Sequence, residues 1–275
     1  MDSIATFLVL SDTHRIAFPN PESLPKVDVV LHCGDLTTVG GLGEYKTEIA
    51  KLKAIDAELK LVIPGNHDVS LDPIWWKAST DECDDAEEPW LALALFRAEQ
   101  GKGLHLLQEG LHTFNLTGNR TFSVYASPYT PAYGGYAFAY NPDEDRWDAG
   151  ARNPMPDKGV DIVMTHGPPE LPSSCGQYVL DMNEKGQHCG CKKLYKAISR
   201  TKPKLHCFGH IHEGYGAQDM DWGIEKVGPV SRDMSVALDA PKEGHTLLVN
   251  AAIQNHGEAV NNEPWIVKLE LGQKS

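Results

Sequence analysis

The sequence predicts an α/β fold in which two β-sheets pack face to face and helices cover their outer faces. Three observations support this prediction. Apolar strands alternate with an amphipathic helix over residues 6–63, later apolar strands follow with few helices between them, and no apolar run approaches the length of a membrane span. With 275 residues and no linker-like or low-complexity stretch, the chain is expected to form one domain over residues 1–275.

The first part of the chain predicts a β/α alternation. Strands are expected at Thr6–Leu10, Val27–His32 and Leu59–Ile63, with a helix at about Leu42–Glu58 before the third strand. The helix prediction depends on Ile49, Leu52 and Ile55, whose spacing of three residues places them on one face.

After His67 the alternation becomes less regular. Because few helices separate the later strands, we expect the second half to be largely antiparallel. The expected helices are Trp90–Gln100 and Cys191–Ser199, and the expected strands are Leu104–Leu107, Thr113–Asn115, Phe122–Tyr125, Val160–Met164, Leu205–Phe208, Thr246–Asn250 and Trp265–Leu269.

Composition excludes several classes of function. The chain has 38 acidic against 25 basic residues and a net charge of −13, which opposes long contacts with a nucleic-acid backbone. The acidic run Asp81–Glu88 is expected to be a solvated surface segment. The N-terminal segment lacks the basic start of a signal peptide, and its apolar run ends at Ser11 and Asp12, so we expect no membrane partner.

The six cysteines are spread through a long chain without secretory features. This pattern favours free thiols in a reducing compartment, and we therefore expect a cytoplasmic protein. Cys33 and Cys207 lie in apolar runs and are expected to be small buried side chains. Cys189 and Cys191 could hold a structural zinc with Cys175, but the usual two-residue spacing is absent, so a turn before a helix is favoured.

Five short polar motifs each follow an apolar run. Because strand ends in an open α/β sheet meet at one edge, we expect these side chains to gather there. Carboxylates, imidazoles and an amide oxygen suit two divalent metals of borderline hardness, namely manganese, iron or zinc. The motifs are Asp12-Thr13-His14, Gly34-Asp35, Gly65-Asn66-His67-Asp68, Thr165-His166 and Gly209-His210-Ile211-His212.

Individual residues fit this interpretation. Asp12 and His14 are separated by one residue, so both can turn toward one cation as the strand ends. Asp35 follows a glycine that permits close approach, and its two oxygens can bridge two metals. The remaining seven histidines are interpreted as ordinary core or surface residues: His32, His105, His112, His188, His206, His245 and His256.

In this order, the motifs D-x-H, G-D, G-N-H-D, H and G-H-x-H resemble those of the calcineurin-like metallophosphoesterase superfamily, over Asp12 to His212. The resemblance implies a four-layer α/β/β/α sandwich of two mixed sheets. It also implies that His67 is the catalytic histidine near the leaving group and that Asp68 orients it. The implied ligands are Asp12, His14, Asp35 and His212 for the first metal, and Asp35, Asn66, His166 and His210 for the second.

A narrower similarity concerns the metallophosphoesterase-domain-containing branch, which resembles class III cyclic-nucleotide phosphodiesterases. It rests on Ser11–His14, His32–Asp35, Thr165–Pro169 and His212–Gly216. The similarity implies hydrolysis of a small phosphodiester, such as a cyclic nucleotide, by a hydroxide that bridges the metals.

Two other functions are weighed against this hypothesis. A phosphomonoesterase, including a protein phosphatase, would favour additional basic residues near the metals, and only Arg15 lies near the motifs. A non-catalytic scaffold would favour a broken ligand set, whereas every ligand position is filled.

The aromatic segment 125–140 leaves two alternatives open. Its side chains either line the pocket and stack on a base or aryl group, or pack against one another in a long loop. The aromatic residues concerned are Tyr125, Tyr129, Tyr133, Tyr136, Phe138 and Tyr140.

Overall fold

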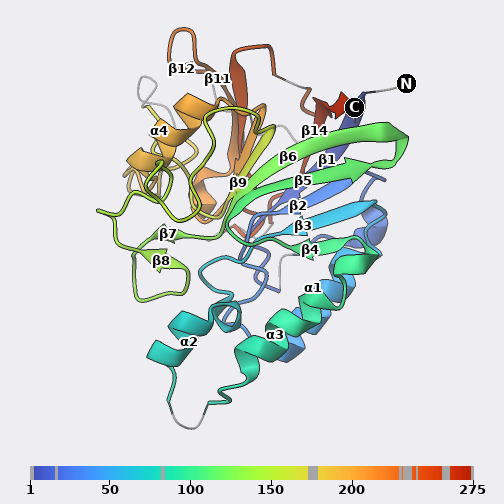
Figure 1. Cartoon of the computed structure of the whole chain (residues 1–275), viewed down its shortest axis with the longest axis vertical. Helices are drawn as coiled ribbons and strands as arrows, with labels where there is room; N and C mark the ends of the chain where they lie inside the picture. The colour runs from blue at the N-terminus through green and yellow to red at the C-terminus, as the bar shows by residue number, and fades with distance from the viewer. Residues whose placement is uncertain are drawn as a thin grey trace.

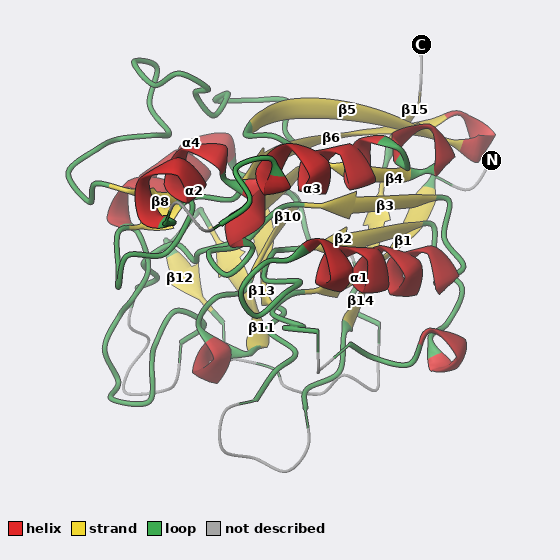
Figure 2. Ribbon diagram, turned by 90° about the horizontal axis from the view of Figure 1, so that it is seen from below, coloured by secondary structure: helices red, strands yellow, loops and turns green. Residues whose placement is uncertain are grey.

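Two β-sheets pack face to face and helices cover both outer faces (Figures 1 and 2). This α/β/β/α arrangement confirms the predicted fold class. The computed structural model describes residues 3–15, 18–81, 84–172, 179–228, 231, 237–239, 241–255 and 261–273.

The first sheet has five strands in the order β14-β1-β2-β3-β4. The strands β1 to β4 run parallel, whereas β14 pairs antiparallel with β1. Their bounds are β1 Ile4–Leu10, β2 Val29–His32, β3 Leu59–Val62, β4 Leu104–Leu106 and β14 Trp265–Glu270.

The second sheet follows the order β12-β11-β13-β10-β9-β6-β15, and β5 pairs with β6. Its central strands β6, β9, β10 and β13 are parallel, and antiparallel pairs occur only toward the edges. The expectation of a largely antiparallel second half is therefore wrong. The crossover from β9 to β10 contains the helix α4 (Lys192–Thr201), whereas a long loop connects β6 to β9 and the edge hairpin of β11 and β12 connects β10 to β13. The bounds are β5 Gly110–Leu116, β6 Arg120–Ser127, β9 Ile162–Thr165, β10 Leu205–Phe208, β11 Gly216–Asp221, β12 Lys226–Val227, β13 His245–Asn250 and β15 Gly272–Gln273.

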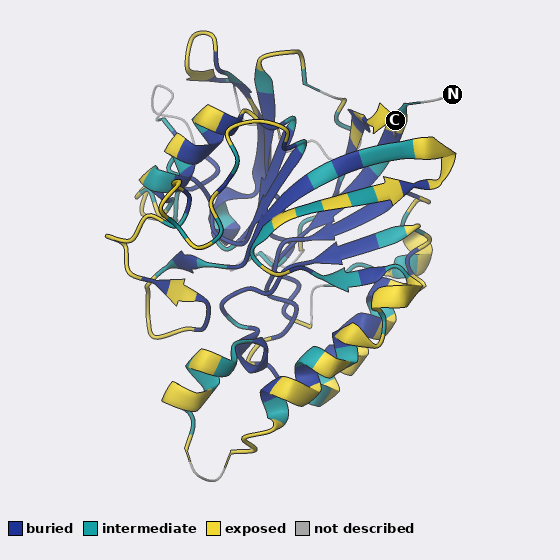
Figure 3. Cartoon of the chain, viewed as in Figure 1, coloured by how far each residue is buried: buried dark blue, intermediate teal, exposed yellow. Residues whose placement is uncertain are grey.

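Three apolar layers hold the sheets and helices together. Side chains such as Phe7 and Val124 fill the space between the sheets. Alternate residues of the same strands point outward, so Leu8 packs with helices α1 (Leu42–Ala54) and α3 (Glu88–Arg97). On the other side, Val163 and Phe208 pack with α4 (Lys192–Thr201). Figure 3 shows the resulting pattern of buried strands and helices exposed along their outer faces.

Two differences from the predicted helices have local causes. The helix α1 ends at Ala54 and not at Glu58, because Ile55 turns into extended backbone and Glu58 already bonds to Asp28 beside β3. A short helix α2 (Pro73–Ser79) was not predicted; Asp72 caps its first turn through the N–H groups of Ile74 and Trp75. Single 3-10 turns occur at Pro21–Ser23, Val69–Leu71, Gln100–Lys102, Thr117–Asn119 and His212–Gly214.

Four cysteines lie in the described ranges, and all are free thiols. Cys33 and Cys207 are buried, as predicted. Cys191 accepts a hydrogen bond from the Leu194 N–H and caps α4, which agrees with a turn before a helix. Cys83, Cys175 and His256 lie outside the described residues.

The described acidic residues at 81, 84, 85 and 87 are exposed. No helix in the described ranges is both long and apolar enough to span a membrane.

Candidate metal centre

The five polar motifs meet at one end of the molecule, but they come from both sheets. Three follow β1, β2 and β3 of the first sheet, and two follow β9 and β10 of the second. The sheets are joined here because Ser11, just after β1, pairs with Ala252, just after β13. The expected edge of one sheet is therefore the shared end of two sheets.

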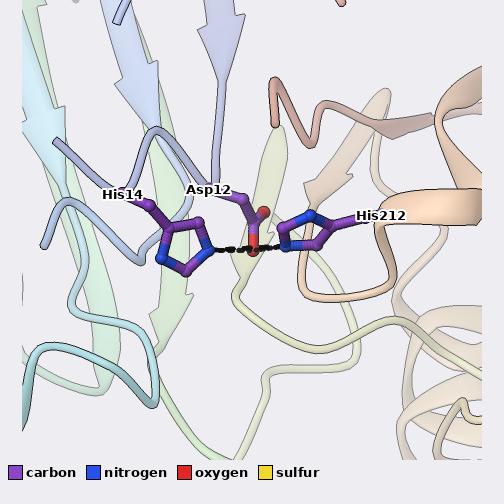
Figure 4. A group of neighbouring side chains, drawn as sticks. All are labelled: Asp12, His14 and His212. Carbon is purple, nitrogen blue, oxygen red and sulfur yellow. Dashed lines mark hydrogen bonds and ion pairs between the residues drawn. The ribbon is translucent and has the colours of Figure 1, made fainter. Parts of the chain in front are cut away.

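Asp12, His14 and His212 form the first group of possible metal ligands, and their ligand atoms all lie within 4.8 Å of one another. The His212 Nε2 is 3.3 Å from Asp12 Oδ1 and 3.4 Å from His14 Nε2. Figure 4 shows the two imidazoles pointing toward each other with the Asp12 carboxylate between them. The group thus combines two imidazoles and one carboxylate, which suits a borderline divalent cation.

Asp12, Asp35 and His166 form the second group. The His166 Nε2 lies 3.4 Å from Asp35 Oδ2 and 2.9 Å from Asn66 Oδ1. The ring of His210 packs beside that of His166, with centroids 5.0 Å apart. The same Asp35 oxygen is 3.7 Å from His14 Nε2, so it lies near imidazoles of both groups.

The backbone at these positions is unusual. Asp12, His14, Asp35 and His210 have φ values of 53°, 42°, 54° and 68°, in the left-handed region that residues other than glycine rarely adopt. Such strain is concentrated at functional sites, where the surrounding structure maintains it. Gly209 also permits close approach, because a Cβ there would overlap the Asp12 carboxylate.

Burial and charge act in opposite directions on the two carboxylates. Burial alone would raise the pKa of Asp35, but the His166 imidazole lowers it to about 2. In the same way, His212 outweighs burial and lowers the pKa of Asp12. Burial would lower the pKa of His166, yet the Asp35 carboxylate raises it to about 9. The site therefore keeps its carboxylates ionised and able to bind cations.

His67 lies beside the first group, with its ring edge-on to His14 at a centroid distance of 4.9 Å and an interplanar angle of 89°. Its Nδ1 is 2.8 Å from the Thr38 carbonyl oxygen. A carbonyl accepts hydrogen bonds, so Nδ1 carries the hydrogen in this contact, and Nε2 is the nitrogen left for chemistry. The His67 backbone N–H also donates to Asp35 Oδ1 at 2.8 Å.

The described hydrogen bonds of Asp68 do not include the His67 ring, although the family resemblance implies that this carboxylate orients the histidine. Its buried carboxylate instead accepts hydrogen bonds from the backbone N–H groups of Gly65, Leu36 and Thr37 and from the Thr37 hydroxyl. The carbonyls of Thr37 and Thr38 in turn contact His14 Nδ1 and His67 Nδ1. Asp68 is thus hydrogen-bonded to the segment 36–38, whose Thr38 carbonyl contacts His67. Burial and the nearby Asp35 charge raise the pKa of Asp68 to about 7.

Two buried histidines support the motif loops. The His32 Nε2 is 3.0 Å from the Thr13 hydroxyl, and the His206 Nε2 is 2.8 Å from the Thr165 hydroxyl. Both side chains are fully buried, which agrees with the interpretation of these residues as core histidines. Their threonine partners lie directly beside candidate ligands, so each histidine helps to fix a motif.

Most of the described aromatic residues of the segment 125–140 pack inside the protein, and one lies at the candidate site. Tyr125 and Tyr140 pack around Trp147, and Tyr129 lies under Arg146. Tyr136 instead reaches the candidate site, where its ring centroid is 4.8 Å from that of His67. The sequence does not single out Tyr136 or the Thr38 carbonyl; the adjacent glycines Gly134 and Gly135 indicate only a turn.

Comparison with known proteins supports the same interpretation. The chain matches a family model described as calcineurin-like phosphoesterase over residues 5–214. It is 33% identical over 218 residues to the human metallophosphoesterase domain-containing protein 1, covering 76% of this chain and 61% of that protein. A UPF0046 protein of Caenorhabditis elegans is 28% identical over 282 residues, which cover 96% of this chain and 60% of that protein.

A protein of Emericella nidulans named probable rhamnogalacturonate lyase C is 32% identical over 226 residues. The matched region covers 81% of this chain but only 18% of that protein. The chain therefore spans less than two thirds of the length of each of these three relatives.

Proposed function

The chain belongs to the calcineurin-like phosphoesterase family, and we propose that it is a dinuclear-metal-dependent hydrolase of small phosphodiesters. The observation that carries this proposal is the pair of Asp/His groups at the shared end of the two sheets. The lyase activity in the name of the Emericella protein does not bear on this proposal, because the match covers only 18% of that protein.

The residues present fit two metal ions. Asp12, His14, Asp35 and His212 would hold the first ion, and Asp35, Asn66, His166 and His210 would hold the second. Asp12 belongs to both groups of neighbouring atoms, but the Asp35 Oδ2 is 3.7 Å from His14 Nε2 and 3.4 Å from His166 Nε2, which supports Asp35 as the proposed bridge. Manganese, iron and zinc suit this mixture of oxygen and imidazole donors.

When bound, the metals would activate water as a nucleophile and neutralise the phosphoryl oxygens. The chain itself supplies the proton for the leaving group. His67 keeps its Nδ1 on the Thr38 carbonyl, so Nε2 is the atom proposed to protonate the departing alkoxide. Asp68 maintains this arrangement by holding the segment that contains Thr38.

The ion pair of Arg15 supports a preference for diesters over monoesters. A monoester carries an additional negative charge and would favour a free cation near the metals. The Arg15 guanidinium is instead paired with Glu44 at 3.0 Å.

We also propose a reducing, cytoplasmic location, which the free thiols among the described residues support.

The central experiment compares bis(p-nitrophenyl) phosphate with p-nitrophenyl phosphate. We expect the manganese-loaded protein to prefer the diester in kcat/KM, to lose activity in excess chelator and to regain it with Mn²⁺. Undiminished turnover by a protein shown to be metal-free would refute the mechanism, and a preference for the monoester would refute the proposed specificity.

Metal analysis tests the proposed bridge separately. We expect Asp35→Ala to lose both metals and His212→Ala to lose chiefly the first, whereas His112→Ala, at a half-buried position on β5 outside the candidate site, should retain both. Two full equivalents of metal in Asp35→Ala would contradict the bridging role.

A further inference from the structure

We propose that Tyr136 determines specificity by forming a stacking platform beside His67 for a planar ring on the leaving group of the substrate. The inference rests on the proposed phosphodiesterase function and narrows its substrates to diesters that carry an aromatic ring, either a nucleobase or a simple aryl group.

The position of the Tyr136 ring carries the inference. The rings of His14, His67 and Tyr136 follow one another outward from the first ligand group, with successive centroid distances of 4.9 Å and 4.8 Å. A leaving group protonated by His67 must lie beside that histidine and therefore near Tyr136. The tyrosine is 38% exposed, so part of its ring is accessible to a ligand. A planar group can stack on such a ring.

The platform is held in place before any substrate arrives. The Trp75 indole N–H, on α2, donates to the Gly135 carbonyl at 2.7 Å. Two residues after Tyr136, the Phe138 N–H donates to the Asp72 carboxylate at 2.9 Å. Figures 1 and 2 show the connection between β7 (Thr130–Pro131) and β8 (Ala139–Tyr140) next to α2. Anchoring on both sides of Tyr136 lowers the cost of ordering it on binding.

The turn itself favours this ring position. Gly134 and Gly135 have φ values of 63° and 77°, which favour glycine. A Cβ at Gly134 would contact the Tyr136 ring, so glycine leaves room for the ring to fold back toward His67. Tyr133, on the same turn, is 77% exposed and provides a matched control.

The test uses the full chain loaded with Mn²⁺ and three diesters. These are cyclic AMP, which carries a base, bis(p-nitrophenyl) phosphate, which carries aryl rings, and glycerophosphoglycerol, which carries no ring. We expect Tyr136→Ala to lower kcat/KM about 5- to 100-fold for the ring-bearing substrates and less than about twofold for the glycerol diester. Tyr136→Phe and Tyr133→Ala should remain within about twofold of wild type on all three. A loss for only one of the ring-bearing diesters would support the platform and show whether it selects a nucleobase or an aryl ring.

Equal losses on all three diesters would overturn the proposal, because they would show that Tyr136 only supports His67. No loss on any of them would overturn it as well.

A binding measurement tests the stacking platform separately from the proposed phosphodiesterase activity. Tyr136→Ala should weaken AMP binding to the metal-loaded protein but not ribose 5-phosphate binding. If the wild type hydrolyses no diester, the proposed function fails, and an unchanged AMP affinity in Tyr136→Ala would then refute the platform independently.

Discussion

The Thr38 carbonyl, and not a carboxylate, holds the His67 ring, and this arrangement determines what removal of the ring should do. His67 is proposed as a proton donor and not as a ligand, so His67→Ala should still bind two metals. The loss in kcat/KM should reach about 10²–10⁴-fold for a diester that releases an alkoxide, and should be much smaller for one that releases nitrophenolate. Kinetics on both substrates, together with metal analysis, check this prediction.

His112→Ala is the matched control, because this half-buried histidine lies on β5, outside the candidate site, and its removal should leave both rates unchanged. Equal losses on the two substrates would show instead that His67 positions the phosphate or the attacking water.

The buried His206 should make stability depend on pH. Burial lowers its pKa to about 3 in the folded protein, against an ordinary value of 6.5. Between these values the unfolded chain binds one proton more, so the free energy of unfolding falls as the pH falls, by about 1.4 kcal/mol per pH unit. His206→Gln should remove this contribution. Urea denaturation of the metal-free proteins between pH 6 and pH 4.5 measures both slopes, and identical slopes would contradict the prediction.

The candidate side chains of the site could be predicted from the sequence, whereas the contacts that support them could not. Polar motifs at strand ends are local features, so Asp12, Asp35 and His166 could be chosen as candidates before their positions were known. The Tyr136 contact depends on how a long loop folds against α2, and the Asp68 contacts depend on a chain segment about 30 residues away. Neither relation leaves a periodic or spacing signal in the sequence.

The turn that follows β10 requires a glycine at position 209. Gly209→Ala should displace Asp12, because the added Cβ would overlap the Asp12 carboxylate and the Ser11 side chain. We expect at least about tenfold weaker Mn²⁺ binding and a loss of about 1–3 kcal/mol in the free energy of unfolding. Calorimetric titration and urea denaturation measure the two effects.

Gly150→Ala is the matched control, because a Cβ there has no neighbour within 4 Å. Wild-type metal affinity in Gly209→Ala would show that the end of β10 can move away from β1 without loss of the site.

Strands were predicted more reliably than the way they connect. The apolar runs located β1, β3, β10 and β14 to within about two residues, because buried strands need continuous apolar sequence. The direction of the central strands in the second sheet could not be obtained in this way. The chain returns from β6 to β9 through residues 128–161, largely without regular structure, so the sequence offers no helix to mark a parallel crossover.

The candidate ligands come from both sheets, so bound metal would join the two halves of the sandwich. Asp12, Asp35 and Asn66 follow strands of the first sheet, whereas His166, His210 and His212 follow strands of the second. A ligand that binds only the folded state stabilises it by about 2.7 kcal/mol at a concentration 100 times its Kd. The metal should therefore stabilise the whole molecule as well as activate the substrate.

Saturating Mn²⁺ should raise Tm by about 5–10 °C over the chelator-treated protein, given that 1 kcal/mol shifts Tm by about 2–4 °C in domains approaching this size. Hydrogen exchange should slow at residues 10–14 of the first sheet and at residues 208–212 of the second, because the ions would contact both strand ends. Calorimetry and exchange mass spectrometry measure these effects, and His112→Ala should respond as wild type does. An unchanged Tm, or protection confined to one sheet, would show that the ligands of the two sheets do not share a metal centre.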